Sequence, residues 1–144
     1  MNPDTWRLVY VSRNRIRGEE AALAAEAATI LEASRRNNPR VGVTGALMFN
    51  RGLFAQVLEG PQAAVEDTFE RIQGDDRHGE VALLSFAPCA ARAFPHWSMA
   101  HVGTQEADAA ALDRFAAESG FDIARLDGER LFTLLRERLA RDDA

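Results

Sequence analysis

Short apolar runs and longer apolar stripes alternate along this chain of 144 residues. The short runs are rich in β-branched and aromatic side chains, a composition typical of strands. They predict five strands, at residues 6–13, 41–49, 53–59, 81–86 and 97–102. Asn50, Arg51 and Gly52 separate the second run from the third, and such turn-forming residues predict a hairpin between these two strands.

An alanine-rich stripe at residues 19–36 predicts the first helix, because its apolar residues recur on one side at helical spacing. We expect this helix to end at Asn37, Asn38 and Pro39. A residue that precedes proline is disfavoured in the helical conformation, and asparagine is common where helices stop.

A second helix is expected to open at Gly60 and Pro61 and to end at Gly74, since proline is tolerated in the first turn of a helix. Its inward stripe consists of Ala64, Val65, Thr68, Phe69 and Ile72. Two more stripes predict helices at 105–118 and 129–141.

The resulting order, β-α-β-β-α-β-β, predicts an α+β fold of the ferredoxin-like sandwich type. We expect a five-stranded mixed sheet with the two long helices on one face and the two C-terminal helices on the other. The chain is therefore divided into a core domain, residues 1–103, and a C-terminal helical extension, residues 104–144, that packs on the sheet. This fold hosts many functions, so topology alone indicates no activity.

The composition fits one globular domain, with 47% hydrophobic and 27% charged residues. The net charge is −5 and every one of the 17 basic residues is arginine, so general nucleic-acid binding is not expected. No apolar run approaches the ~18 residues that cross a bilayer, and the first residues do not resemble a signal peptide. We therefore expect a cytoplasmic protein that binds neither nucleic acid nor membrane.

Cys89 is the only cysteine. A disulfide within the chain and a cysteine-based metal cage are thereby excluded, and we expect no metal site. The simplest interpretation of Cys89 is a small thiol that is buried or half-buried.

Two polar side chains fall on apolar strand faces. Gln56 shares a strand face with Phe54 and Leu58, and Tyr10 lies on a packed face of the first strand. A buried amide without a hydrogen-bond partner costs about 1–3 kcal/mol. Gln56 therefore needs a partner, either a side chain such as Tyr10 or a polar ligand.

Four other residues allow both a structural and a functional interpretation. Asn37 and Asn38 can stop a helix, or they can present their amides to a planar ligand with carbonyl and imide edges. Trp97 and Met99 share one face of the last predicted strand, where such residues usually belong to the core.

The combination of motifs is more specific than any one residue. Tyr10 in LVYVSR, Asn38 in SRRNNPRVGVTGAL, Gln56 in GLFAQVLEGP, and the segment FPHWSM closely resemble the flavin-binding blue-light sensor family known as BLUF. The resemblance runs from Trp6 to Val102 in unbroken order. It implies that residues 1–103 bind a flavin noncovalently between the two long helices, and that no substrate is turned over.

The resemblance also implies roles for single residues. Tyr10 is similar to the family's photoactive tyrosine, and Gln56 to the glutamine that bridges this tyrosine to flavin N5 and the C4 carbonyl. Asn38 matches the asparagine that holds the carbonyl and imide edge of the ring, with Asn37 as a second contact. Arg71 matches a basic position on the ligand side.

Positions further from the flavin ring follow from the same resemblance. Asp75 and His78 match residues near the ribityl and phosphate end, although a carboxylate and a histidine in a solvated loop are the simpler interpretation. Trp97 and Met99 match strand residues beside the glutamine that carry the signal. We expect FAD as the flavin, with FMN and riboflavin as open alternatives.

The residues after Val102 are too few for the cyclase, phosphodiesterase or DNA-binding domains that larger family members carry. We therefore expect output through an unidentified downstream protein or through a homo-oligomer. Two alternatives stay open: a flavin-free interaction module of the same fold, and a small acyl-phosphate hydrolase using Arg13 and Asn38. The hydrolase would need a phosphate cradle, and no convincing glycine-rich anion loop follows the first strand.

Overall fold

The computed structural model describes residues 5–14, 20–49, 53–74, 78–94, 100–101, 106–117 and 126–142. Five strands form one sheet in the order β4-β1-β3-β2-β5. They are β1 (Trp6–Asn14), β2 (Thr44–Phe49), β3 (Leu53–Gly60), β4 (His78–Pro88) and β5 (Ala100–His101). The first four are antiparallel to their neighbours, and the short β5 pairs parallel with β2, so the sheet is mixed as predicted.

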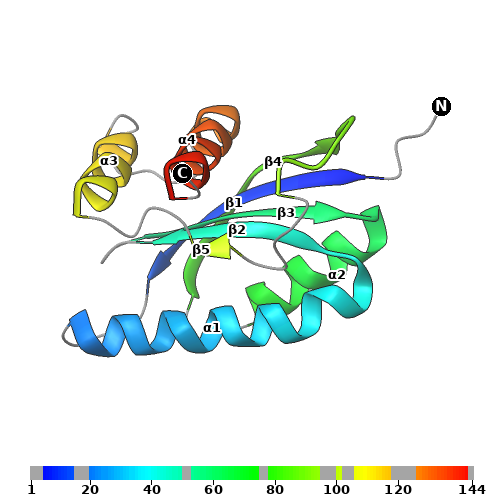
Figure 1. Cartoon of the computed structure of the whole chain (residues 1–144), viewed down its shortest axis with the longest axis horizontal. Helices are drawn as coiled ribbons and strands as arrows, with labels where there is room; N and C mark the ends of the chain where they lie inside the picture. The colour runs from blue at the N-terminus through cyan, green and yellow to red at the C-terminus, as the bar shows by residue number, and fades with distance from the viewer. Residues whose placement is uncertain are drawn as a thin grey trace.

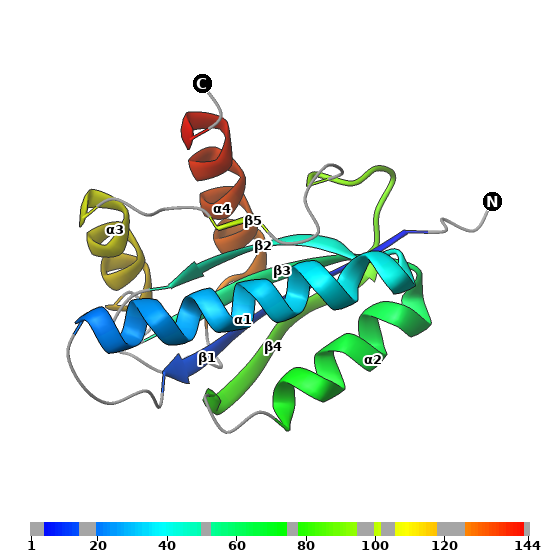
Figure 2. The same cartoon turned by 60° about the horizontal axis from the view of Figure 1, so that its bottom comes forward.

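Helices cover both faces of this sheet (Figure 1). The helices α1 (Glu20–Val41) and α2 (Gln62–Gln73) lie on one face, and Figure 2 shows them running across it side by side. The helices α3 (Glu106–Ala117) and α4 (Gly128–Asp142) lie on the other. The predicted ferredoxin-like α+β fold is therefore confirmed.

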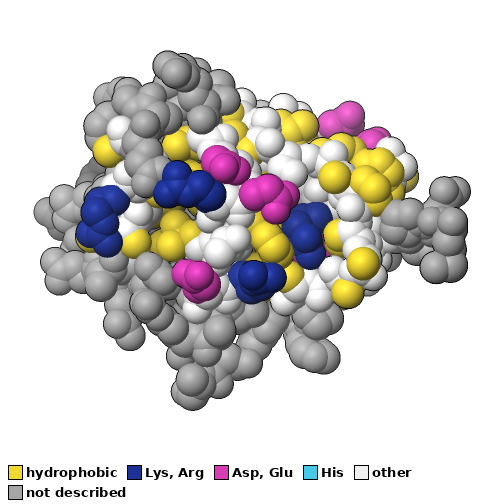
Figure 3. Space-filling view, turned by 90° about the horizontal axis from the view of Figure 1, so that it is seen from above, with side chains coloured by type: hydrophobic (Ala, Val, Ile, Leu, Met, Phe, Trp, Pro, Cys, Tyr) yellow, Lys and Arg dark blue, Asp and Glu magenta, His cyan; other side chains and the backbone are white. Residues whose placement is uncertain are grey.

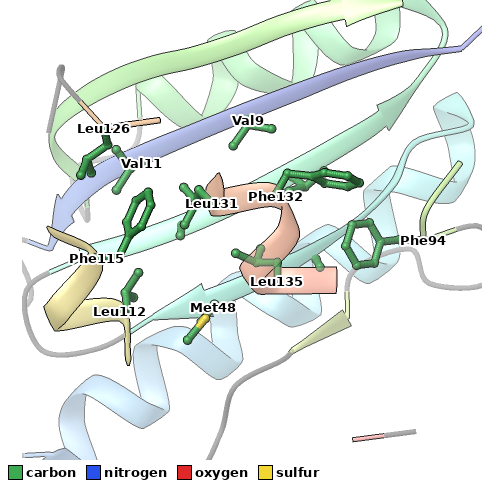
Figure 4. Packing of buried hydrophobic residues seen from close by; sticks show 13 residues of the cluster. Val9, Val11, Met48, Phe94, Leu112, Phe115, Leu126, Leu131, Phe132 and Leu135 are labelled. Carbon is green, nitrogen blue, oxygen red and sulfur yellow. The ribbon is translucent and has the colours of Figure 1, made fainter. Parts of the chain in front are cut away.

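The strand period of two sorts the side chains of β3 into two cores. Phe54, Gln56 and Leu58 face α1 and α2, where Phe54 and Leu58 join the apolar cluster that contains Val65 of α2. The alternate residue Val57 joins a second cluster with α3 and α4. In Figure 4, aromatic and leucine side chains of α3 and α4 pack over Val9, Val11 and Met48 of the sheet.

The predicted end of the first helix is wrong. Helix α1 continues through Asn38 and Pro39 to Val41, so the second strand starts at Thr44 and not at Val41. The helix stops where Gly42 adopts φ +74°. There the N–H of Val43 donates to the Asn38 carbonyl and the N–H of Gly42 to the Pro39 carbonyl, at 3.0 and 3.4 Å.

This pair of hydrogen bonds is the Schellman arrangement, in which a residue with positive φ ends a helix. Glycine adopts that conformation at no steric cost, whereas the preference against helix before proline is only a bias. The cap at Gly42 therefore decides the helix end, and Asn38 becomes part of the last helical turns.

Candidate functional site

Tyr10 and Gln56 meet at the centre of the sheet. They occupy directly opposed positions on the antiparallel strands β1 and β3. The Tyr10 hydroxyl donates a hydrogen bond to Oε1 of Gln56. Both side chains are buried, with 0% and 2% of their surface exposed. The strand register thus joins the two polar residues that the apolar pattern singled out.

The Tyr10–Gln56 pair lies beneath both long helices. Leu31 of α1 and the pair Val65 and Phe69 of α2 belong to the same buried cluster as Tyr10. The rings of Tyr10 and Phe69 lie 5.2 Å apart at 51°, a tilted aromatic contact. The hydrogen bond is therefore made in an apolar layer, where it is stronger than in water.

Asn38 is buried in the last turns of α1, with 2% of its surface exposed, and Asn37 is half-buried beside it. Helix α1 covers the same sheet face as Tyr10 and Gln56. The structure therefore brings two primary amides and one phenol to the layer between α1, α2 and the sheet. Together these groups can both donate and accept hydrogen bonds.

Arg71 lies in the last turn of α2 and is exposed. Its guanidinium donates to Oγ1 of Thr68 at 3.5 Å, and that hydroxyl donates to the Ala64 carbonyl at 2.8 Å. A cation in the last turn is favourable there because the C-terminal end of a helix carries partial negative charge. The same position leaves Arg71 accessible to an anionic ligand.

The remaining predicted residues lie, wholly or with their side chains, outside the described part of the chain. Asp75, Trp97 and Met99 lie outside the described residues. His78 is the first residue of β4, where its backbone pairs with Asn14. Its side chain is not among the described parts of the chain. Arg13 is placed only by its backbone in β1.

Sequence reasoning missed Glu59, which stands near the end of β3. Its side chain is fully buried on the face opposite Gln56, and it forms an ion pair with Arg7 at 2.8 Å. The carboxylate also accepts the backbone N–H groups of Ala93 and Phe94 at 3.0 and 2.9 Å. A charged residue inside an apolar strand, on the face toward a core, was the available signal.

Cys89 is half-buried, as expected, directly after β4. Burial raises the pKa of its thiol above the ordinary value of 9.0, and Glu59 adds to this rise. Arg7 and Arg92 act in the opposite direction. The thiol therefore stays protonated at neutral pH, which fits a packing role.

Within the described part of the chain, no group of three or more His, Cys, Asp and Glu side chains could hold a metal ion. No helix among the residues described is long and apolar enough to cross a membrane.

Fold and site together define a ferredoxin-like domain with a buried tyrosine–glutamine pair between its sheet and its two long helices. The family model for sensors of blue-light using FAD, BLUF, matches residues 6–100. The chain belongs to this family of blue-light flavin sensors, and the resemblance drawn from the motifs is confirmed. It is thus a member of a family of blue-light sensors that bind flavin.

Curated relatives match only over part of their length. The photoactivated adenylate cyclase subunit beta of Euglena longa is 37% identical over 71 residues, which are 49% of this chain and 8% of that protein. The blue light- and temperature-regulated antirepressor BluF of Escherichia coli strain K12 is 36% identical over 83 residues, 56% of this chain and 20% of that protein. The chain thus spans less than a tenth of the cyclase subunit.

Solved structures match over nearly the whole chain. The dark-state structure of the BLUF protein BlrB has a TM-score of 0.75 and 30% identity, and the match covers 99% of both chains. The photo-activated state of BlsA has a TM-score of 0.73 and 29% identity over 94% of both chains. The similarity to these two proteins therefore includes the region of α3 and α4.

Proposed function

We propose that this protein is a blue-light photoreceptor in which Tyr10 and Gln56 form the light-responsive hydrogen-bond pair beside a noncovalently bound flavin. The observation that carries the proposal is the buried hydrogen bond between the two side chains, placed under α1 and α2. Membership of the blue-light sensor family supports the ligand class.

The donor set fits a flavin ring. Such a ring presents a carbonyl and imide edge that needs both donors and acceptors, and an amide supplies one of each. Gln56, on the covered face of the sheet, and Asn38, in helix α1, are amides with 2% of their surface exposed. Asn37, which precedes Asn38 in α1 and is half-buried, is proposed as a third amide contact. A bound flavin would act as a strong oxidant when excited by light, and the protein would bind and orient the flavin.

Tyr10 and Gln56 then have distinct tasks. With a flavin bound, the phenol of Tyr10 could give an electron and its hydroxyl proton to the photo-excited ring, and it would recover both from the ring in darkness. In the structure, Oε1 of Gln56 accepts the hydrogen bond from the Tyr10 hydroxyl. With a flavin bound, rotation or tautomerisation of this amide would exchange its donor and acceptor ends, and the changed hydrogen bond to the flavin would shift the absorption.

We propose FAD as the flavin. The family description names FAD, and Arg71 offers an accessible guanidinium at the end of α2 for a phosphate. Asp75 and His78 are assigned to the same ribityl and phosphate end. Release of the bound flavin by denaturation, followed by chromatography against FAD, FMN and riboflavin, tests this assignment.

Output is proposed to pass through Trp97 and Met99 to the C-terminal helices, and from there to a downstream protein or a second copy of the chain. A groove of about 400 Å³ lies between α3 and α4, with Phe115 and Leu134 among its lining residues. Arg114 and Glu137 also line it, and Figure 3 shows basic and acidic side chains beside apolar surface on this face. Light scattering in darkness and under blue light tests whether the mass changes.

The central experiment is an absorption spectrum of the dark-purified protein before and after blue illumination. We expect a flavin spectrum that shifts to the red and recovers in darkness. Tyr10→Phe and Gln56→Leu should abolish the shift and keep the bound flavin. Ser12→Ala is the matched control, because it removes another fully buried hydroxyl from the same face of β1.

Ser12→Ala should keep the shift. A wild-type protein that takes up no flavin would overturn the proposal and would favour the alternative function, a flavin-free interaction module. A normal spectral shift in Tyr10→Phe or Gln56→Leu would overturn the role assigned to these two residues. The proposed photoreceptor function would still hold.

A further inference from the structure

The face of the sheet opposite Gln56 holds a closed network around Glu59. Both oxygens of this buried carboxylate are used, Oε2 by Arg7 and Ala93 and Oε1 by the N–H of Phe94. The contacts join three parts of the chain that are distant in sequence: β1, β3 and the connection that follows β4. A buried carboxylate without partners strongly destabilises a fold, so the loss of any one of these contacts is unfavourable.

Arg7 extends the network to α4. While its Nε donates to Glu59, a terminal guanidinium nitrogen donates to the Ala91 carbonyl at 3.1 Å. The guanidinium carbon lies 4.1 Å from the centre of the Phe132 ring, within the range of a cation–π contact. One arginine therefore contacts the strand carboxylate, the connection and the helix at the same time.

Phe132 also contacts the connection directly. Its ring meets that of Phe94 edge to face at 6.2 Å and 89°. Phe94 is fully buried, and Phe132 is almost so. The short segment 91–94 is thus attached to α4 by an aromatic pair as well as through Arg7.

The other side of segment 91–94 is attached to the end of α1. Arg92 donates to Oγ1 of Thr44 at 3.0 Å and to the Gly42 carbonyl at 2.8 Å. Gly42 caps the helix whose last turns contain Asn38. Four consecutive residues therefore connect the end of α1, on one face of the sheet, with α4 on the other.

We propose that Glu59, Arg7 and Phe132 are positioning residues of a coupling junction, which transmits a light-driven displacement of segment 91–94 to helix α4. This inference rests on the proposed photoreceptor function. A displacement of Ala93 or Phe94 removes an N–H from the buried Glu59 carboxylate, so the carboxylate and Arg7 must rearrange together. Because Arg7 lies over Phe132, that rearrangement changes the packing of α4.

The test compares Phe132→Leu with Phe115→Leu. Both phenylalanines are 7% exposed, both belong to the same apolar cluster, and both lie beside an arginine guanidinium. Only Phe132 contacts the ring of Phe94 and Arg7. Glu59→Gln is the second test variant, and the exposed Glu70→Gln on α2 is its control.

The readout is amide hydrogen exchange of residues 128–142 in darkness and under blue light, recorded with the flavin spectrum of the same sample. In the wild type, Phe115→Leu and Glu70→Gln, we expect exchange that differs at least twofold between light and dark. Phe132→Leu and Glu59→Gln should keep the spectral shift and lose this difference. Residues with a merely structural role would change exchange equally in light and dark.

The inference is overturned if Phe132→Leu and Glu59→Gln keep the full light-minus-dark difference. It is also overturned if the wild type shifts its spectrum without any light-dependent exchange in α4, a result that leaves the photoreceptor intact. A wild type without a spectral shift would instead overturn the proposed function, so the two failures are distinguishable.

Discussion

The hydroxyl of Tyr10 donates its hydrogen bond to Gln56 across a single pair of opposed strand positions. No loop or helix intervenes, so the geometry of the pair is fixed by the register of β1 and β3. A slip of one residue would turn the two side chains to opposite faces of the sheet. The pair is therefore as rigidly placed as the sheet itself.

A double-mutant cycle should detect this hydrogen bond. Tyr10→Phe removes the donor, and Gln56→Leu removes the acceptor from the same buried layer. We expect the two changes in unfolding free energy to be non-additive by about 1 kcal/mol, the net value of a typical hydrogen bond. Urea unfolding in darkness measures it. Strict additivity would show that the two groups do not interact.

Gly45 should tolerate no side chain. A Cβ at this position would clash with the Val57 carbonyl oxygen of the neighbouring strand, so β2 and β3 would have to separate. We expect Gly45→Ala to lower the free energy of unfolding by about 3 kcal/mol or more. Gly74→Ala is the control, because a Cβ there lies 3.6 Å from its nearest neighbour and the backbone is helical.

Thermal unfolding of both alanine variants provides the comparison. Gly74→Ala should change stability by no more than about 1 kcal/mol, with a gain expected from the lower entropy of the unfolded chain. Equal losses in the two variants would contradict the close approach at Gly45.

Arg7→Met should be strongly destabilising. The substitution keeps much of the apolar stem and leaves the fully buried Glu59 carboxylate without its cation. Breaking a buried ion pair costs about 3–5 kcal/mol, and because 23% of the Arg7 side chain is exposed we expect the lower end of this range. Chemical denaturation measures the loss.

A second substitution should not restore stability. In Arg7→Met combined with Glu59→Leu, the buried charge is gone, but the N–H groups of Ala93 and Phe94 have lost their acceptor. Full recovery in this double variant would show that these two hydrogen bonds contribute little.

The Cys89 thiol should react slowly at neutral pH. Burial raises its pKa above 9.0, so the folded protein holds less thiolate than the unfolded chain at any pH near that value. This group therefore contributes its full stability below pH 9 and loses the contribution as the pH rises through the folded pKa. The rate of alkylation by iodoacetamide, measured against pH with and without urea, should show the displaced midpoint.

Arg7 lowers the pKa of Cys89, so Arg7→Met should move the alkylation midpoint further upward. A folded midpoint at or below that of the unfolded chain would contradict the burial of the thiol.

Periodicity was sufficient for most of the fold. The hairpin of β2 and β3, the helix after Pro61 and the two-sided cover of the sheet all follow from apolar positions and turn residues, and the structure contains them. The end of α1 did not follow, because the preference against helix at Asn38, before Pro39, is weaker than the cap that Gly42 provides. Only the backbone angle at Gly42 and its two hydrogen bonds decide that boundary.

The site was predictable in part. Tyr10 and Gln56 stood out because each places a polar group on an apolar face, yet their direct pairing depends on strand register, which a single sequence does not provide. Glu59 obeys the same rule and was overlooked, because a charge close to the end of a strand is also typical of a solvated turn. Its partners Ala93 and Phe94 lie 34 and 35 residues away, beyond any local pattern.

Neighbouring residues of β3 belong to different layers of the molecule, with Gln56 under the long helices and Val57 under the C-terminal pair. Mutation can therefore change the exposed surface of α3 and α4 without changing the side chains on the opposite face of the sheet. The length of β3 cannot change in the same way. One inserted residue would turn every later side chain of the strand to the opposite face of the sheet. Descendants of this chain should vary on the exposed sides of α3 and α4 and keep the residue count of β3 unchanged.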